Sequence, residues 1–466
     1  MRTPAATTAL KILAHPFTSF HPRRMPLLAR RNYRSELVAT TFFSMALGMV
    51  EGSAMGVVVK NAFDGIADER RLNYVVGIII AAPDFANLTS FLWAAWSHGK
   101  PKVRFVNALQ LMVLLLVGLV AVVPRTSNGL LMLAACMVAA RVSISGIVTL
   151  RATVWRANYP TSDRARVTGK LAILQSTIVA STGIIIGSLM DWSVDSFRVI
   201  FPCAAVLGMT GIYAYSHVRV RRERSILRAE VAGKRHERPS INPISIYTTL
   251  RADRNYAWFM LWMFIFGSGN LMFPPILVIT LREQFHLGYL GGIVIMQSLP
   301  YVIMPMFIPL WARLLDSVHV VKFRTIHSWV FVAAQGMILI AAFAHAIPLM
   351  YFASVLLGIA YAGGTLAWNL GHLDFAPPHQ ASQYMGVHVT LNGVRGLLAP
   401  LLAVTLFELL GTRGMSPESA SASVFAVSVA LCITGAIGFV WLSHSMGAGK
   451  NVDLGKKRPA QRVKHK

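Results

Sequence analysis

The chain has 466 residues, of which 55% are hydrophobic and only 14% are charged. This composition excludes an ordinary water-soluble globular protein and is typical of a chain whose main solvent is lipid. A net charge of +25 would indicate nucleic-acid binding in a soluble protein, but the basic residues here lie in short segments beside long apolar stretches. We therefore expect these residues to contact anionic lipid headgroups, and we expect no nucleic-acid partner.

Twelve apolar stretches follow one another along the chain. Each has about 20 residues or slightly more, and a helix of that length, rising about 1.5 Å per residue, crosses about 30 Å of hydrocarbon. The sequence therefore predicts an all-α membrane protein. Its twelve transmembrane helices are expected at 37–59, 73–97, 105–123, 128–150, 170–190, 196–216, 255–280, 287–311, 325–345, 348–370, 386–409 and 421–445.

Positive charge is concentrated in every second gap between these stretches. Of the 44 Lys and Arg residues, 35 lie in the two tails and in the gaps that follow helices 2, 4, 6 and 8, whereas 7 lie in the other gaps. Basic residues gather on the cytoplasmic side of membrane proteins. We therefore predict a multi-pass protein of the cell (inner) membrane, with both termini in the cytoplasm.

The widest gap divides the twelve helices into two sets of six. The predicted parts are a basic cytoplasmic N-terminal tail at 1–35, a six-helix bundle at 36–216, a basic cytoplasmic linker at 217–254, a second six-helix bundle at 255–446 and a basic cytoplasmic C-terminal tail at 447–466. A linker so rich in Arg is expected to lie at the headgroups.

The two halves also repeat each other. Leu92-Trp93-Ala94 recurs 218 residues later as Leu310-Trp311-Ala312. The spacing of nine residues between Pro160 and Gly169 recurs 217 residues later at Pro377 and Gly386. Two matches at nearly the same offset, in corresponding loops, indicate an internal duplication and two pseudo-symmetric bundles.

This organisation resembles the major facilitator superfamily over about residues 36–446. The loop after helix 2 is similar to the signature loop of that family, although it keeps the basic cluster and lacks the acid. The loop residues that carry the resemblance are Lys100, Lys102 and Arg104 after helix 2, Arg164 after helix 4, and Asp316, Lys322 and Arg324 after helix 8. The resemblance implies a transporter fold in which helices 1, 4, 7 and 10 line a central cavity.

Each ionisable side chain at mid-membrane depth costs about 2.5–3.5 kcal/mol on insertion. Such residues are therefore expected to have a functional role or a partner of opposite charge. Glu51 in helix 1 and Arg141 in helix 4 differ in depth by about 6 Å at about 1.5 Å per residue, which is within reach of two long side chains. The resemblance places both on the substrate path, where Glu51 would bind a cationic group or a proton. The alternative is a static ion pair that fixes helix 1 against helix 4.

Asp84 in helix 2 and Arg395 in helix 11 form a second candidate pair. Helices 2 and 11 face each other across the two halves in the superfamily. The resemblance therefore implies an inter-bundle gating pair that breaks and forms as the halves move. A permanent clamp between the bundles is the equally weighted alternative.

Helices 7 and 10 supply the remaining candidates for the substrate path. Helix 7 contains Gly267-Ser268-Gly269-Asn270 followed by Pro274-Pro275, which predicts a broken or kinked helix that lines a cavity, with Asn270 on the substrate path. Helix 10 ends with Trp368 and Asn369, which are suited to a binding wall. Tight helix packing at the glycines, and an interfacial anchor at Trp368, are the alternatives.

The leading hypothesis for the function is a secondary active transporter that moves a small solute by alternating access. Proton coupling through Glu51 or Asp84 is one option. No phosphate-binding loop is present, so ATP hydrolysis within this chain is not expected. We expect no enzyme, no metal, no cofactor and a monomer; the three cysteines lie in apolar stretches as buried hydrophobes. The alternative is a non-transporting membrane receptor or assembly factor on a transporter scaffold.

Overall fold

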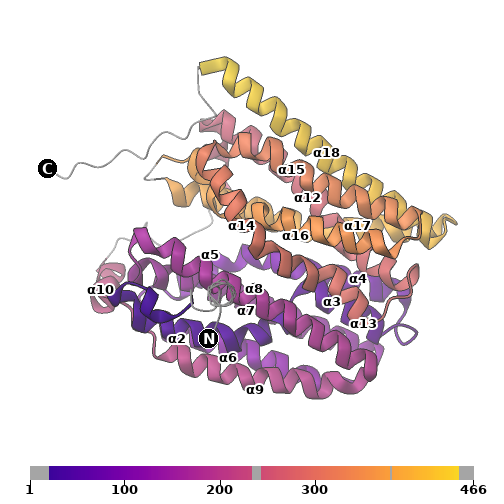
Figure 1. Cartoon of the computed structure of the whole chain (residues 1–466), viewed down its shortest axis with the longest axis horizontal. Coiled ribbons are helices and arrows are strands. Elements are labelled where there is room, and N and C mark those ends of the chain that lie inside the picture. Colours follow the sequence, from indigo (N-terminus) through magenta and orange to yellow (C-terminus); the bar gives the residue numbers. More distant parts are fainter. Residues whose placement is uncertain (1–19, 233–242, 378–379, 451–466) are drawn as a thin grey trace, which may run out of the picture.

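A computed structural model describes residues 20–232, 243–377 and 380–450. Within these ranges, twelve helical segments are long and apolar enough to cross a membrane, and they form two bundles (Figure 1). The prediction of an all-α protein with twelve membrane-spanning helices is therefore confirmed. Parts of the predicted tails and of the predicted linker lie outside the described residues.

Several spans of the first bundle consist of more than one helical piece. The pieces are α2 (Leu27–Met49) and α3 (Gly52–Ala62); α4 (Glu69–Phe85), η2 (Ala86–Thr89) and α5 (Ser90–Trp96); α6 (Lys102–Leu119) and η3 (Val120–Val122); α7 (Ser127–Asn158); α8 (Thr161–Trp192); and η4 (Val194–Ser196) with α9 (Phe197–Ser216). A short 3-10 turn, η1 (Pro22–Arg24), precedes α2.

Two short helices in the linker lead to the second bundle. They are α10 (Glu223–Ala232) and α11 (Pro243–Ala252). The second bundle contains α12 (Arg254–Glu283); α13 (Tyr289–Ile293), the π-helix η6 (Val294–Ser298) and α14 (Leu299–Ser317); α15 (Val320–Phe343); α16 (Ile347–Leu370) with η7 (Gly371–Asp374); α17 (Ala381–Thr412); and α18 (Pro417–Lys450).

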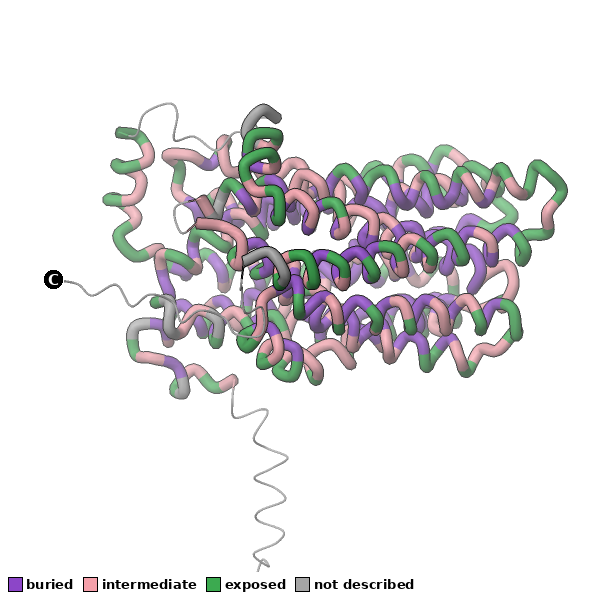
Figure 2. Tube along the Cα trace, turned by 90° about the horizontal axis from the view of Figure 1, so that it is seen from above, coloured by how far each residue is buried: buried purple, intermediate pink, exposed green. Residues whose placement is uncertain are grey.

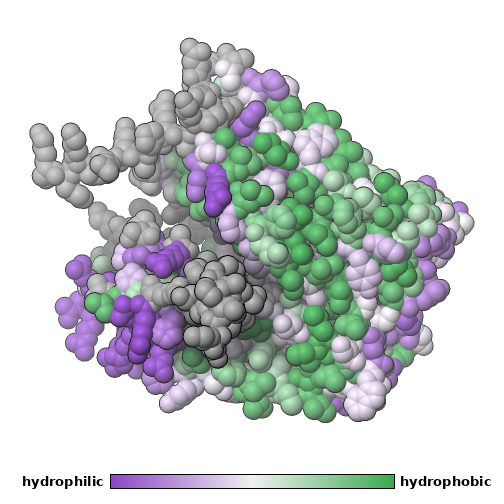
Figure 3. All heavy atoms as spheres, in the orientation of Figure 1, coloured by the Kyte–Doolittle hydropathy of each residue, from purple (hydrophilic) through white to green (hydrophobic). Residues whose placement is uncertain are grey.

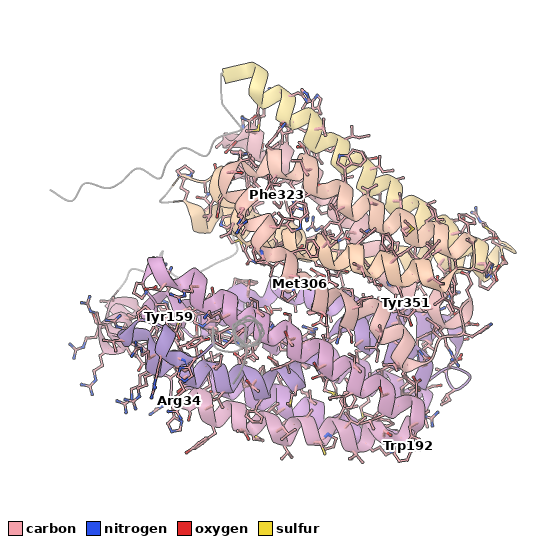
Figure 4. All side chains as sticks on the ribbon, in the orientation of Figure 1. Arg34, Tyr159, Trp192, Met306, Phe323 and Tyr351 are labelled. Atoms are coloured by element: carbon pink, nitrogen blue, oxygen red, sulfur yellow. The ribbon has the colours of Figure 1, made fainter. Side chains whose placement is uncertain are left out.

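The two ends of the molecule differ in charge. We call the end that carries α10 the linker end; Arg34 and Tyr159 lie toward it, and Trp192 and Tyr351 lie toward the opposite end (Figure 4). Hydrophilic side chains lie at both ends and most densely at the linker end, and apolar side chains cover the middle of the visible face (Figure 3). Along each span, buried positions alternate with exposed ones (Figure 2). This pattern suits helices that pack on one side and meet lipid on the other.

The internal repeat has a direct counterpart in three dimensions. The indole Nε1 of Trp93 donates to Val142 O at 2.9 Å, and the indole Nε1 of Trp311 donates to Ile359 O at the same distance. In each half, a glycine on the receiving helix, Gly146 or its counterpart 217 residues later, leaves room for the ring. The same tryptophan contact therefore fixes span 2 against span 4 and span 8 against span 10.

Helix 7 has no break at its prolines. The helix α12 runs through Pro274 and Pro275 as a single element. A neighbouring helix also contacts this segment, because Ser428 Oγ of α18 donates to Gly269 O at 2.6 Å. The interrupted element is instead the first span, between α2 and α3.

The helices α12 and α18 pack closely along glycines. A Cβ atom added at Gly438 would overlap the ring of Trp262, and one added at Gly435 would overlap Phe266. In membranes, small residues at helix interfaces let two backbones approach each other and gain van der Waals contact. The absence of a side chain at these two positions therefore sets the separation of the two helices.

We predict that Gly438→Ala lowers the melting temperature of the purified protein by a few degrees, because overpacking a tight site costs about 1–3 kcal/mol. Thermal unfolding in detergent measures the effect. The matched control is Gly336→Ala on α15, where an added Cβ meets open space. Equal melting temperatures for the two variants would contradict the prediction.

Candidate functional site

The interruption of the first span creates a polar centre at mid-membrane depth. Val50 caps α2, and Glu51 has an extended backbone with φ −67° and ψ 123°. A helix end leaves carbonyl groups without intrahelical donors, and lipid offers none. Arg141 of α7 supplies one, because its Nε donates to Val50 O at 2.6 Å. Arg141 therefore provides the donor that the carbonyl at the helix end lacks, and that carbonyl provides an acceptor for the buried guanidinium.

Arg141 is also the counter-ion of Glu51. Its Nη2 lies 2.6 Å from Glu51 Oε2, and the side chains are 8% and 17% exposed, respectively. From the second bundle, Tyr301 on α14 and Tyr361 on α16 are close enough to the Glu51 carboxylate to interact with it electrostatically. The structure therefore brings Glu51 and Arg141 together and places the carboxylate at the boundary between the bundles.

Asp84 and Arg395 do not form the direct pair that the sequence predicts. Asn392 lies between them: its Nδ2 donates to Asp84 Oδ1 at 3.2 Å, and its Oδ1 accepts from Arg395 Nη2 at 2.8 Å. The guanidinium is drawn toward α12 instead, where Gly267 leaves space for it and Met263 O accepts a hydrogen bond from Nη1. The contact between the bundles therefore runs through an amide.

The candidates on helices 7 and 10 lie apart from one another. Asn270 Oδ1 accepts from Gln335 Nε2 at 2.9 Å, so this side chain is engaged with α15 of its own bundle. The half-buried Trp368 packs edge-on against His388 of α17, with 5.6 Å between the ring centroids. Asn369 is exposed and donates to Thr365 O of its own helix. Of these candidates, Trp368 alone packs on a polar ring of another helix.

The acid that is absent from the loop after helix 2 comes from the linker. Glu230 Oε2 of α10 accepts from Gly99 N at 2.7 Å and from Lys102 Nζ at 2.9 Å. Lys102 is buried, whereas Lys100 and Arg104 are exposed. A residue about 130 positions away in the chain therefore completes the charge balance of this loop.

The other loop candidates have separate surroundings. Arg164 Nη2 donates to Tyr159 O at 3.2 Å and so caps the end of α7. Asp316 and Lys322 are exposed. Arg324 is only 3% exposed, and its Nη1 contacts His327 Nδ1 at 3.3 Å. Arg324 thus belongs to the interior of the second bundle and not to a solvated loop.

At the opposite end, a polar network that we did not predict from the sequence joins the bundles. The buried Lys60 Nζ lies 2.5 Å from Glu283 Oε1 of α12 and 2.8 Å from Asn73 Oδ1 of α4. Asn73 Nδ2 in turn donates to Glu408 Oε1 of α17 at 2.8 Å. We call these four residues the opposite-end network. The signal in the sequence was that Lys60 is among the 7 basic residues outside the charge-rich gaps.

Further polar contacts join the bundles at the opposite end and nearer their middle. Arg282 Nη2 lies 2.8 Å from Asp64 Oδ2, and Asp191 accepts from Tyr289 N at 2.7 Å. Deeper in the membrane, Ser298 Oγ donates to Ala180 O at 2.9 Å. Among the described residues, Asn392–Asp84 is the contact of this kind nearest to the linker end, and the ribbons of the two bundles diverge toward that end (Figure 1). The bundles are thus joined asymmetrically.

A second unpredicted feature is a buried carboxylate near the linker end. Glu36 of α2 is fully buried, accepts from Tyr159 Oη at 2.8 Å and also accepts from the indole of Trp155. Burial and the neighbouring carboxylate raise the pKa of the Tyr159 phenol above its ordinary value, so the phenol remains a neutral donor. Because Glu36 lies at the edge of the first apolar stretch, its burial was not evident from the sequence.

Double-mutant cycles will separate the two charge pairs. We expect a coupling free energy above about 1 kcal/mol for Glu51→Gln with Arg141→Gln, because the two groups touch and share the helix break. For Asp84→Asn with Arg395→Gln, we expect a smaller coupling, because Asn392 intervenes. SDS-induced unfolding in mixed micelles provides the free energies of unfolding, and a larger coupling for the second pair would refute the expectation.

The linker contact yields another prediction. Glu230→Gln should lower the melting temperature, because the buried Lys102 ammonium loses its counter-ion and such a loss costs about 3–5 kcal/mol for a fully buried pair. Glu223→Gln, at the other end of α10, serves as the control and should leave the melting temperature unchanged. Equal effects of the two substitutions would mean that α10 is not anchored through Glu230.

Comparison with known proteins agrees with this architecture. The structure is similar to a mutant of the nucleoside transporter NupG (TM-score 0.66, 12% identity, 88% of this chain and 100% of that chain). It is also similar to an auto-inhibited peptide transporter of the POT family (0.67, 12%, 92% and 99%) and to a bacterial homologue of the human lysosomal transporter Spinster (0.62, 11%, 92% and 99%). At these identities, the likeness shows the fold alone.

The sequence places the chain in a family. Among curated proteins, no relative matches it. The model of the Major Facilitator Superfamily matches residues 37–400, which is most of the chain. Together with twelve apolar helices in two bundles, this match shows that the protein belongs to the major facilitator superfamily of membrane transporters.

Proposed function

We propose that the protein is a secondary active transporter that moves a small solute by alternating access. The observation that carries the proposal is the asymmetric joining of the bundles: their polar contacts extend from the middle to the opposite end, where Lys60 meets Glu283. Such contacts seal one end of a path between the bundles and leave the other end free to admit solute. Loss of the seal at one end and formation of one at the other constitutes alternating access.

The concentration of positive charge gives the proposed orientation. The linker end carries the gaps that hold most of the 44 Lys and Arg residues, and basic residues are retained in the cytoplasm. In the proposed orientation, the described state opens toward the cytoplasm. The opposite-end network then acts as the outer gate of the transporter.

Glu51 and Arg141 form the proposed centre for solute or proton binding. The carboxylate lies at the boundary between the bundles, beside Tyr301 of α14, and it also supports Arg141 at the helix break. A proton or cationic group that binds Glu51 weakens its hold on Arg141 and hence on the interruption in span 1. Binding at this point therefore biases the equilibrium between the two access states, as coupling requires.

A receptor or assembly factor on the same scaffold would not need the bundles to move. The structure offers a direct way to separate the two functions, because the opposite-end network is distant from the linker end. If the protein alternates between two access states, a substitution in the opposite-end network must alter the distance between the bundles at the linker end. If it is a static scaffold, the linker end will not respond.

We predict that Lys60→Gln shifts the protein toward a state that is closed at the linker end. Loss of one partner from a buried pair costs about 3–5 kcal/mol in the state that buries it, and each 1.4 kcal/mol changes a two-state ratio about tenfold. Spin labels at Arg104→Cys on α6 and Lys322→Cys on α15, both exposed positions, report the distance between the bundles in nanodiscs. We expect a shorter component to become dominant.

The labelled background replaces the three native residues Cys136, Cys203 and Cys432 by alanine. The control is Arg198→Gln, also at the opposite end, whose side chain contacts Asp195 and Ala121 O of its own bundle. This control should leave the distance distribution unchanged. Identical distributions for Lys60→Gln and the background would argue against alternating access and favour the static scaffold.

A further inference from the structure

The charged side chains buried in this protein nearly all have a partner of opposite charge. Six Lys, Arg or Glu side chains among the described residues are buried: Glu36, Lys60, Lys102, Arg141, Arg324 and Arg395. Ion pairs balance Lys60, Lys102 and Arg141. Glu36 interacts electrostatically with Arg151, and Arg395 reaches Asp84 through Asn392.

Arg324 is the exception. It is 3% exposed, its Nη1 contacts a neutral acceptor at His327 Nδ1, and its Nε has no hydrogen-bond partner among the described residues. His327 Nε2 is already engaged with Ala360 O at 2.8 Å, so its ring donates there and accepts from Arg324. The charged neighbour close enough to interact with Arg324 is Arg395, which has the same sign. The second bundle thus holds one uncompensated positive charge.

Two further side chains with unsatisfied nitrogen atoms lie within electrostatic range of this charge. His388 lies within electrostatic range of both Arg324 and Arg395, and His388 Nε2 and Arg395 Nε lack partners among the described residues. His388, Asn392 and Arg395 occur at i, i+4 and i+7 on α17 and so share one face of that helix. The ring of Trp368 packs against His388 and forms an aromatic wall beside the cluster.

An isolated buried charge is strongly unfavourable, and proteins ordinarily pair it or bind a counter-ion. Nearby histidines offer at most hydrogen bonds, and the adjacent Arg395 adds repulsion. Guanidinium groups present a planar fork of N–H donors that matches the two oxygens of a carboxylate or a phosphate. The missing component of this cluster therefore has the chemistry of an oxyanion.

We infer that Arg324, Arg395 and His388 form a binding site for an oxyanion, and that the transported solute carries this group as a carboxylate or a phosphate. The inference rests on the proposed transport function and adds the substrate class to it. The cluster lies in the half of the second bundle nearest the linker end, the end at which the bundles diverge.

The test titrates purified protein in detergent with sodium phosphate, sodium malonate or sodium chloride at equal ionic strength and measures the melting temperature. We expect phosphate or malonate to raise the melting temperature of the unmodified protein by several degrees in a saturable manner. We expect that rise to be lost in Arg324→Met. Without added oxyanion, Arg324→Met should melt at a higher temperature than the unmodified protein, because it removes an uncompensated charge.

Two further variants make the result specific. Arg324→Lys keeps the charge but loses the planar fork, so the concentration for half-maximal effect should increase at least tenfold. Arg198→Met removes an arginine at the opposite end and should retain the full response. A response to phosphate alone identifies a phosphate-bearing solute, a response to malonate alone identifies a carboxylate, and either result supports the site.

Three results would overturn the inference. They are no oxyanion response in the unmodified protein, an equal response to chloride, and an undiminished response in Arg324→Met. None of these would affect alternating access, because the distances between the spin-labelled bundles are measured without added anion. Conversely, a static scaffold could still bind an oxyanion at Arg324, so the failures of the two proposals are distinguishable.

Discussion

The bond between Arg141 and the interrupted first span is the interaction on which the centre of the molecule depends. A broken helix at mid-membrane depth leaves backbone groups that lipid cannot satisfy, and a buried guanidinium needs acceptors that lipid cannot supply. Arg141 joins these two requirements by bonding both Val50 O and the Glu51 carboxylate. The same carboxylate lies close to α14 and α16 of the second bundle. The ion pair that stabilises the buried Arg141 therefore also forms part of the contact between the two bundles.

The other contacts between the bundles also pair polar groups that lipid cannot satisfy. These contacts are stronger at the opposite end than near the middle of the membrane. Lys60, Asn73, Glu283 and Glu408 exchange hydrogen bonds at the opposite end, where each group would otherwise be stranded near the membrane. Nearer the linker end, the contact between Asp84 and Arg395 is made through an amide, which is weaker than a direct ion pair. Strong contacts at one end and weaker ones in the middle are consistent with the alternating access that we propose.

Two departures from the family pattern concern the charged loops. The loop after helix 2 lacks its acid, and Glu230 of the linker occupies the corresponding role beside Lys102. In the second half, Arg324 belongs by sequence to the equivalent loop, yet it is buried among α15, α16 and α17. The positive charge of Arg324, which the sequence places in a solvated loop, is therefore in the protein interior and requires a negatively charged partner there.

The sequence by itself determined the number of spans, their division six and six, and the repeat, because hydrophobic length and charge position act along the chain and can be counted. It also indicated that Glu51, Arg141, Asp84 and Arg395 needed partners. Only the tertiary structure decided the partners themselves. The roles of Asn392 and Glu230 arise from distances between segments far apart in the chain. The same holds for the helix break: the prolines predicted one in α12, which is continuous, whereas span 1 is interrupted where Arg141 donates to Val50 O. Local propensity is visible in sequence, whereas hydrogen bonds from neighbouring helices are not.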